Sequence, residues 1–394
     1  MKAFFEKISL LSLSLMMISP FSVSPAIPKM IAFYQAQGHP ASQVDILFSL
    51  SSFAVLAMLL LNPMISSFLS EKAIIILGLL LIGIGGALPV FIQSYPLVFL
   101  SRIILGLGIG LINAKAINII SERFTGKERI KMLGYRASTE VLGASLFTFI
   151  SGYLIVFGWT QAFMIYLLAL IILVLYLLFV PDMPHPSSKD QAELVADQKN
   201  KSLTREQLKL IIGLALYAGF VILINTSNTL RIPLVVDHLG IGSARDASFI
   251  LALMMLMGIL AGFTFSRLLE IFKVYLMAAV VIALGLGMLI LWQAQSLVSV
   301  GLGALITGFV YSIGVTLAFN TISEKFPSHQ LTKATTLVLI GCNVGGAAAA
   351  FVLQLIAHWF DSLIAAYVIY SIISLLLGLS LFLRVILKRK KHQG

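Results

Sequence analysis

The feature that most constrains this chain is a series of apolar runs, each roughly 20 residues long, that recurs about twelve times along its 394 residues. A helix of that length spans about 30 Å, which is the thickness of the hydrocarbon core of a bilayer. Hydrophobic residues make up 59% of the chain and charged residues only 11%, too little charge to cover a water-soluble core. The sequence therefore predicts an all-α integral membrane protein with twelve transmembrane helices.

Cysteine content and charge exclude several classes of protein. The single cysteine, Cys342, has no disulfide partner in the chain, and twelve helices leave no room for a large soluble catalytic domain. The net charge of +11 is read as a topology signal, because cytoplasmic loops of membrane proteins collect Lys and Arg. With the N-terminus in the cytoplasm, only Lys29, Arg231 and Arg245 fall on the opposite side. We therefore expect a protein of the cytoplasmic membrane with both termini inside and no nucleic-acid partner.

A hydrophilic segment divides the chain into two halves. Residues 1–180 are expected to form an N-terminal six-helix bundle, 181–206 a cytoplasmic linker, and 207–394 a C-terminal six-helix bundle with a basic cytoplasmic tail. The linker ends in a sequence that resembles a capped helix start, with Thr204 followed by Gln207. An N-terminal signal peptide is the alternative for Lys2, Lys7 and the apolar run after them. The length of that run and the charge pattern favour a first transmembrane helix.

The two halves carry an internal repeat. Residues 118–124, Asn-Ile-Ile-Ser-Glu-Arg-Phe, match residues 320–326, Asn-Thr-Ile-Ser-Glu-Lys-Phe, at an offset of 202 (320 − 118). A common offset over two helices and their loop indicates a duplicated unit. Two six-helix halves in parallel orientation are typical of one large transporter architecture, with its substrate site at the interface of the halves. The same offset relates three further pairs: Gly106 with Gly308, Lys131 with Lys333, and Gly143 with Gly345.

These features identify the chain by resemblance as a member of the major facilitator superfamily. Arg102, Gly106 and Gly108 match the family's Arg-x-x-x-Gly-x-Gly signature in helix 4. The resemblance implies a rocker-switch transporter whose cavity is lined by helices 1, 4, 7 and 10. The end of helix 1, residues 24–28, Ser-Pro-Ala-Ile-Pro, is similar to that of bacterial drug and solute exporters. The Gly-Pro signature of drug antiporters in helix 5 is missing, and only Gly143 matches it.

The loop motif of the family after helix 2 is strongly altered. Ser67 stands where the family has an acidic residue that helps to lock one access state. The second half keeps more of the pattern, as Gly262 followed by Ser266 and Arg267. The lock is therefore expected to be absent or to be built from serine hydroxyls.

Three charged residues, Arg102, Lys115 and Glu140, are predicted to lie at membrane depth, where each charge costs a few kcal/mol unless it is paired or hydrated. At about 100° per residue, Asn113 returns to the face of Arg102, whereas Lys115 lies roughly 140° away. The resemblance implies that Arg102 faces the cavity, where it binds an anionic group or regulates a proton. The alternative is that Arg102 reaches the outer headgroups. Lys115 is a candidate for substrate contact or for a structural bridge between helices.

Glu140 is the candidate proton carrier, because a carboxylate in a partly dry cavity can take up and release protons near neutral pH. Arg136 lies one turn earlier and could instead neutralise Glu140 in a structural i, i+4 pair. An ion pair with Lys115 is a third interpretation.

Uncharged polar residues gather on the four helices that the resemblance assigns to the cavity. They are candidates for substrate contact, with ordinary helix packing as the alternative. Helix 1 should also bend or break at Pro20, Pro25 and Pro28. The candidate polar residues are Ser19, Ser22, Asn225, Asn228, Tyr311, Ser312 and Thr316.

The function predicted from these features is proton-coupled efflux of a small amphipathic or drug-like solute by a monomer in the lipid bilayer. The alternative is transport of a small anion held by Arg102 and Lys115. An enzyme is disfavoured, because the sequence has no His pair at metal spacing, no nucleophile elbow and no phosphate loop. A non-transporting receptor has no supporting feature, and no cofactor or metal is expected.

Overall fold

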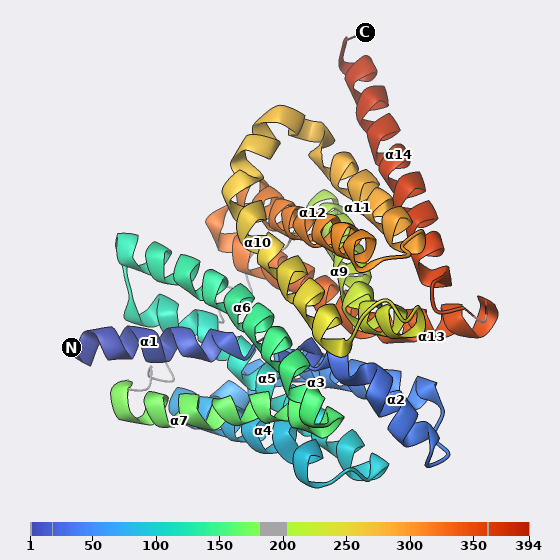
Figure 1. Ribbon diagram of the computed structural model, residues 1–394. Coiled ribbons are helices and arrows are strands. Elements are labelled where there is room, and N and C mark those ends of the chain that lie inside the picture. The colour runs from blue at the N-terminus through green and yellow to red at the C-terminus, as the bar shows by residue number, and fades with distance from the viewer. Residues whose placement is uncertain (1, 18, 182–202, 361, 394) are drawn as a thin grey trace.

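The computed structural model describes residues 2–17, 19–181, 203–360 and 362–393 of the chain, and every regular element in these ranges is helical (Figure 1). The fold is therefore all-α, as predicted. The N-terminal elements are α1 (Lys2–Leu15), η1 (Ser19–Phe21), η2 (Ser24–Ala26), α2 (Ile27–Gln35), α3 (Ala41–Phe68), α4 (Glu71–Phe91), α5 (Tyr95–Arg123), α6 (Gly126–Leu154), η3 (Ile155–Phe157), η4 (Trp159–Leu167) and α7 (Leu168–Phe179). The C-terminal elements are α9 (Arg205–His238), α10 (Ala244–Phe272), η5 (Lys273–Tyr275), α11 (Leu276–Trp292), α12 (Leu297–Lys325), α13 (Ser328–Phe360) and α14 (Ala365–Gln393).

Ten helical stretches among the described residues are long and apolar enough to cross a bilayer. One of them, Ala244–Trp292, contains both α10 and α11. The first segment is broken into α1, η1, η2 and α2, so the predicted break is confirmed at Pro20 and Pro25, whereas Pro28 lies in the first turn of α2, where proline is tolerated. The count of twelve transmembrane helices stays a prediction.

The linker between the halves falls largely on residues 182–202, which lie outside the described part of the chain. Its predicted helix cap is confirmed at the start of α9. The Thr204 hydroxyl accepts a hydrogen bond from the Gln207 backbone N–H at 3.2 Å, and the Gln207 side-chain oxygen accepts one from the Thr204 N–H at 2.9 Å. This capping box satisfies two backbone donors that a helix start would otherwise leave open.

Glycines related by the sequence repeat make equivalent contacts in the two bundles. A Cβ atom on Gly106 would collide with the backbone of Ser51 on α3, and one on Gly308 would collide with the backbone of Met254 on α10. The repeat places α3 and α10 at equivalent positions, so the two halves use the same close helix approach. Small residues allow such an approach between membrane helices.

The second glycine pair of the repeat behaves in the same way. Gly143 of α6 lies against the backbone of Leu15 on α1, and Gly345 of α13 lies against the backbone of Gly219 on α9. Both glycine pairs of the sequence repeat therefore make equivalent helix contacts in the two bundles.

The two bundles touch at one end and separate toward the other. At the end where they separate, an ion pair of 2.8 Å between Glu6 and Arg123 joins the start of α1 to the end of α5 within the N-terminal bundle. We call the end that carries the chain termini the terminal end and the opposite end the distal end. Figure 1 shows α6 and α10 side by side near their distal ends, whereas the N-terminus and C-terminus lie far apart.

Contacts between α6 and α10 are close at the distal end and are lost toward the terminal end. Gly152, near the distal end of α6, approaches Ser248 so closely that a Cβ atom would collide with its side chain. At mid-height the Ser145 hydroxyl donates a hydrogen bond of 3.0 Å to the carbonyl oxygen of Ala252. Nearer the terminal end, a Cβ atom on Gly134 or Gly262 would meet nothing within 4 Å. We call the α6–α10 contact the seam, and it closes the distal half of the interface.

Replacing Gly308 with Ala should destabilise the C-terminal bundle by about 1–3 kcal/mol, because the new Cβ atom overpacks the contact with α10. Thermal unfolding in detergent should therefore occur at a lower temperature. Gly213→Ala is the matched control, since nothing lies within 4 Å of its Cβ position on α9. Equal unfolding temperatures for Gly308→Ala and Gly213→Ala would contradict the assigned contact.

Candidate functional site

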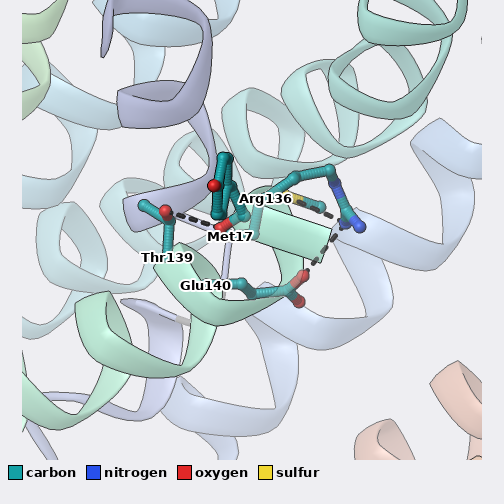
Figure 2. A network of polar contacts seen from close by, with 5 residues as sticks. Met17, Arg136, Thr139 and Glu140 are labelled. Atoms are coloured by element: carbon teal, nitrogen blue, oxygen red, sulfur yellow. Dashed lines mark hydrogen bonds and ion pairs between the residues drawn. The ribbon is translucent and has the colours of Figure 1, made fainter. Parts of the chain in front are cut away.

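An ion pair between Arg136 and Glu140 lies on α6, one helical turn apart. The Arg136 Nη2 and Glu140 Oε2 atoms are 2.9 Å apart, and the side chains are 13% and 25% exposed. Arg136 Nη2 also lies 3.6 Å from the sulfur of Met17, which follows α1. Figure 2 shows the guanidinium in contact with both partners. The i, i+4 pair considered in the sequence analysis is therefore present in this conformation.

The pair faces the C-terminal bundle. The carboxylate of Glu140 acts electrostatically on Tyr311 of α12, and Cys342 of α13 acts on the same phenol. Val141, next to Glu140, lies 3.7 Å from the Cβ position of Gly258 on α10. Glu140 thus stands where the seam ends and the bundles begin to separate. A carboxylate in this place changes its surroundings whenever the bundles move against each other.

Lys115 and Asn113 of α5 are both partly exposed. No ion pair within 4.0 Å joins Lys115 to Glu140, although both side chains lie in the described part of the chain. The third interpretation of Glu140, an ion pair with Lys115, is therefore not found in this conformation. Substrate contacts of Lys115 and Asn113 stay predictions.

Arg102 lies inside the N-terminal bundle. Its side chain is 2% exposed, and Nη2 donates a hydrogen bond of 3.0 Å to the carbonyl oxygen of Gly86 on α4. The guanidinium carbon lies 4.7 Å from the ring centre of Phe163 and 5.6 Å from that of Tyr166, both on η4. These carbonyl and aromatic partners hold the cation by hydrogen bonding and cation–π attraction. In this conformation Arg102 therefore contacts its own bundle and is not exposed as the headgroup alternative would have it, while its action on a substrate or a proton stays a prediction.

The polar residues of α9 connect helices of the C-terminal bundle. Asn228 Nδ2 donates a hydrogen bond of 3.0 Å to Thr307 Oγ1 on α12, and both side chains are fully buried. The Asn228 Oδ1 atom and the Asn225 Oδ1 atom are buried without a hydrogen-bond partner. An unsatisfied buried amide oxygen is costly and is a ready acceptor for a ligand or water.

The candidate residues of the first segment and of α12 are placed as follows. Ser22 is fully buried and its hydroxyl has no hydrogen-bond partner, while Ser19 lies in η1 with its side chain outside the described set. The Ser312 hydroxyl donates to the carbonyl oxygen of Gly308 in its own helix at 3.0 Å. Tyr311 is partly exposed and Thr316 is exposed. Their roles in substrate binding stay predictions.

The residues of the loop motif are exposed. The Ser67 hydroxyl donates a hydrogen bond of 2.6 Å to the Met64 carbonyl oxygen of its own helix. Gly262, Ser266 and Arg267 are exposed on α10. The serine hydroxyl considered as a possible lock is thus bonded within α3 in this conformation.

Sequence reasoning missed one buried acid. Asp45 lies four residues inside α3 and is only 8% exposed, and the cation that acts on it electrostatically is Arg231 of α9. Its position at the edge of an apolar run concealed it, because helix ends are uncertain by a few residues. A carboxylate within the first turns of a membrane span was the available signal. No group of three or more His, Cys, Asp or Glu that could hold a metal occurs among the described residues.

Comparisons with known proteins agree with this architecture. No curated protein matches the chain. Among solved structures, the chain is similar to a D-xylose-proton symporter, with a TM-score of 0.72, 16% identity and 97% of each chain covered. It is also similar to peptide transporter POT in complex with sulfate, with a TM-score of 0.75, 14% identity, and 98% of this chain and 94% of that chain covered. At this identity the likeness shows the fold alone. The model of the Major Facilitator Superfamily matches residues 9–349 and 232–394, and the chain therefore belongs to this superfamily of membrane transporters.

Proposed function

We propose that this transporter moves a small amphipathic solute out of the cell by proton-coupled, rocker-switch alternating access. The observation that carries the proposal is the Arg136–Glu140 ion pair at the point where the bundles separate. A proton carrier must meet water in one state and be enclosed in another. The Glu140 side chain is partly exposed beside the seam in this conformation, and closure of the terminal end would enclose it.

The coupling works through the charge of Glu140. Without a proton, the carboxylate neutralises Arg136 across 2.9 Å. A proton on the carboxylate removes this attraction and leaves Arg136 as an uncompensated cation beside Tyr311 and the C-terminal bundle. The two protonation states therefore favour different arrangements of α6 against α12, which is the differential interaction that a population shift requires.

The chemistry near the pair suits an amphipathic solute better than an anion. Arg136 and Glu140 sum to zero charge, and Met17 and Tyr311 add apolar and aromatic surface nearby. The anion alternative depends on Arg102 and Lys115 together, and Arg102 is enclosed by Gly86 and Phe163 in this conformation. Export is supported by the resemblance of residues 24–28 to bacterial exporters, and the excess of Lys and Arg near the terminal end favours a cytoplasmic position for that open end.

Glu140→Gln should abolish solute movement driven by a pH gradient in proteoliposomes, because an amide cannot carry the proton, while solute binding remains measurable. Cationic, neutral and anionic amphipathic solutes are each offered under an imposed gradient. Glu128→Gln serves as the matched control, since Glu128 is an exposed carboxylate of the same helix that pairs with Lys7. Unchanged gradient-driven transport by Glu140→Gln would refute the coupling role.

Arg102→Ala should destabilise the protein by about 2 kcal/mol or more, since the charged hydrogen bond and the cation–π contact are both lost. Thermal unfolding in detergent measures this loss. Residual binding should fall to the same extent for neutral and for anionic solutes. A selective loss of anion binding would instead support the anion transporter.

A further inference from the structure

An apolar groove of about 450 Å³ runs between α9 and α13 of the C-terminal bundle, and all the residues that line it belong to these two helices. Its floor lies where the two backbones approach each other. A Cβ atom on Gly341 would collide with the backbone of Ala215, and one on Gly345 would collide with the backbone of Gly219. Larger side chains form the walls, and among them Leu216 is 70% exposed.

The groove is long and follows the helices. Its lining on α9 extends from Leu208 to Leu223. Fifteen residues (223 − 208) correspond to about 22 Å of helix at 1.5 Å per residue. One leaflet supplies half of a hydrocarbon core that is about 30 Å thick. The groove is therefore long enough to hold an acyl chain from the leaflet around the terminal end, where α9 begins.

The α9 wall of the groove faces the bilayer side of the C-terminal bundle. At about 100° per residue, Leu216 and Leu223 lie within about 40° of Ser227 around the helix. The Ser227 hydroxyl lies 2.9 Å from the hydroxyl of Tyr370 on α14. Figure 1 shows α14 on the side of the C-terminal bundle away from the N-terminal bundle, close to α13 at its start and far from it at the C-terminus. Toward the terminal end this face of α9 is therefore left uncovered.

The α13 wall is the exposed side of its helix. Val344 and Phe351 are seven residues apart, so they share a face, and both are 47% exposed. Cys342 lies roughly 160° around the helix from Val344 and is only 5% exposed. The groove thus opens on the outer surface of the bundle.

Basic side chains lie at the terminal mouth of the groove. Arg205 and Lys209 are exposed in the first turns of α9. They precede Leu216 by eleven (216 − 205) and seven (216 − 209) residues, which places each within about 20° of its face. Lys333 of α13 stands in the same relation to Val344, eleven residues later (344 − 333). The same faces that form the apolar walls therefore end in cations.

The cations of the two helices are held close to one another. A hydrogen bond of 2.8 Å from Gln207 Nε2 to Gln330 Oε1 joins the starts of α9 and α13. Glu206 follows Arg205 directly and lies about 100° from it around the helix. An apolar groove with a basic mouth fits an amphiphile with an anionic head. Anionic lipids are enriched in the cytoplasmic leaflet, and basic pockets between membrane helices bind their headgroups.

We propose that the groove binds an anionic phospholipid, with its phosphate at Arg205, Lys209 and Lys333 and one acyl chain along Leu216 and Val344. The walls accept the chain of any phospholipid, whereas the mouth selects by headgroup charge. A zwitterionic headgroup brings a cation of its own to the mouth and is bound less well. The lipid contacts the C-terminal bundle alone, so the site does not depend on proton coupling at Glu140 or on the direction of transport.

The experiment uses the full chain in phosphatidylcholine vesicles, with a fluorophore attached at Val344→Cys and with Cys342→Ala. Increasing fractions of phosphatidylglycerol or phosphatidylcholine, each with a nitroxide on its acyl chain, serve as quenchers. Half-maximal quenching should need about fivefold less of the anionic lipid, the scale of the attraction that one basic residue exerts at a membrane surface. Leu376→Cys on α14 is the matched probe site, since it is 62% exposed and lies eleven residues (387 − 376) from the end of its span at Leu387. There the two lipids should quench alike.

Neutral variants of the mouth provide the second comparison. Arg205→Gln combined with Lys209→Gln should abolish the preference for phosphatidylglycerol at the Val344 probe. Arg129→Gln with Lys131→Gln is the control, since it removes one exposed arginine and one exposed lysine from the start of α6, and it should leave the preference unchanged. Equal quenching by the two lipids at Val344, an equal preference at Leu376, or a preference that survives the loss of Arg205 and Lys209 would each overturn the lipid site.

Discussion

Each half of this protein depends on the close approach of helix backbones at glycines. Lipid tails are as apolar as leucine side chains, so membrane helices associate through tight packing and hydrogen bonds. Gly106 and Gly308 provide that packing at equivalent places in the two bundles. The seam between the bundles also has a close glycine contact, Gly152 against Ser248, and it adds a hydrogen bond from the Ser145 hydroxyl. The same kind of packing therefore operates within the bundles and between them.

The buried charges divide according to where their partners lie. Arg102 is compensated inside its own bundle, so rotation of the bundles leaves its contacts with Gly86 unchanged. Glu140 is paired on its own helix but faces the opposite bundle. Asp45 of α3 and Arg231 of α9 are both buried, and they belong to opposite bundles. A charge whose partners all belong to one bundle keeps them when the bundles rotate, whereas the surroundings of a charge that faces the other bundle change.

Sequence patterns predicted the features that depend on local chemistry. Apolar runs gave the helical spans, Pro20 marked the break of the first segment, and the spacing of Arg136 and Glu140 gave their pairing. The environment of Arg102 could not be found this way. A helical wheel places Arg102 on a face, but its carbonyl partner belongs to α4 and its aromatic partners belong to η4. The same applies to the burial of Asp45 and Arg231, which depends on helices distant in the sequence.

The duplication that produced the fold copied packing and the charges of the loop after helix 4, but it did not copy the Arg136–Glu140 ion pair. At the offset of 202 the counterpart of Glu140 is Cys342 (342 − 140), and the counterpart of Arg136 is Val338 (338 − 136). The pseudo-symmetric position in the second half therefore offers no second carboxylate at this level of the interface. In the proposed cycle the proton therefore binds in the N-terminal half at this level, and the two halves are functionally unequal partners.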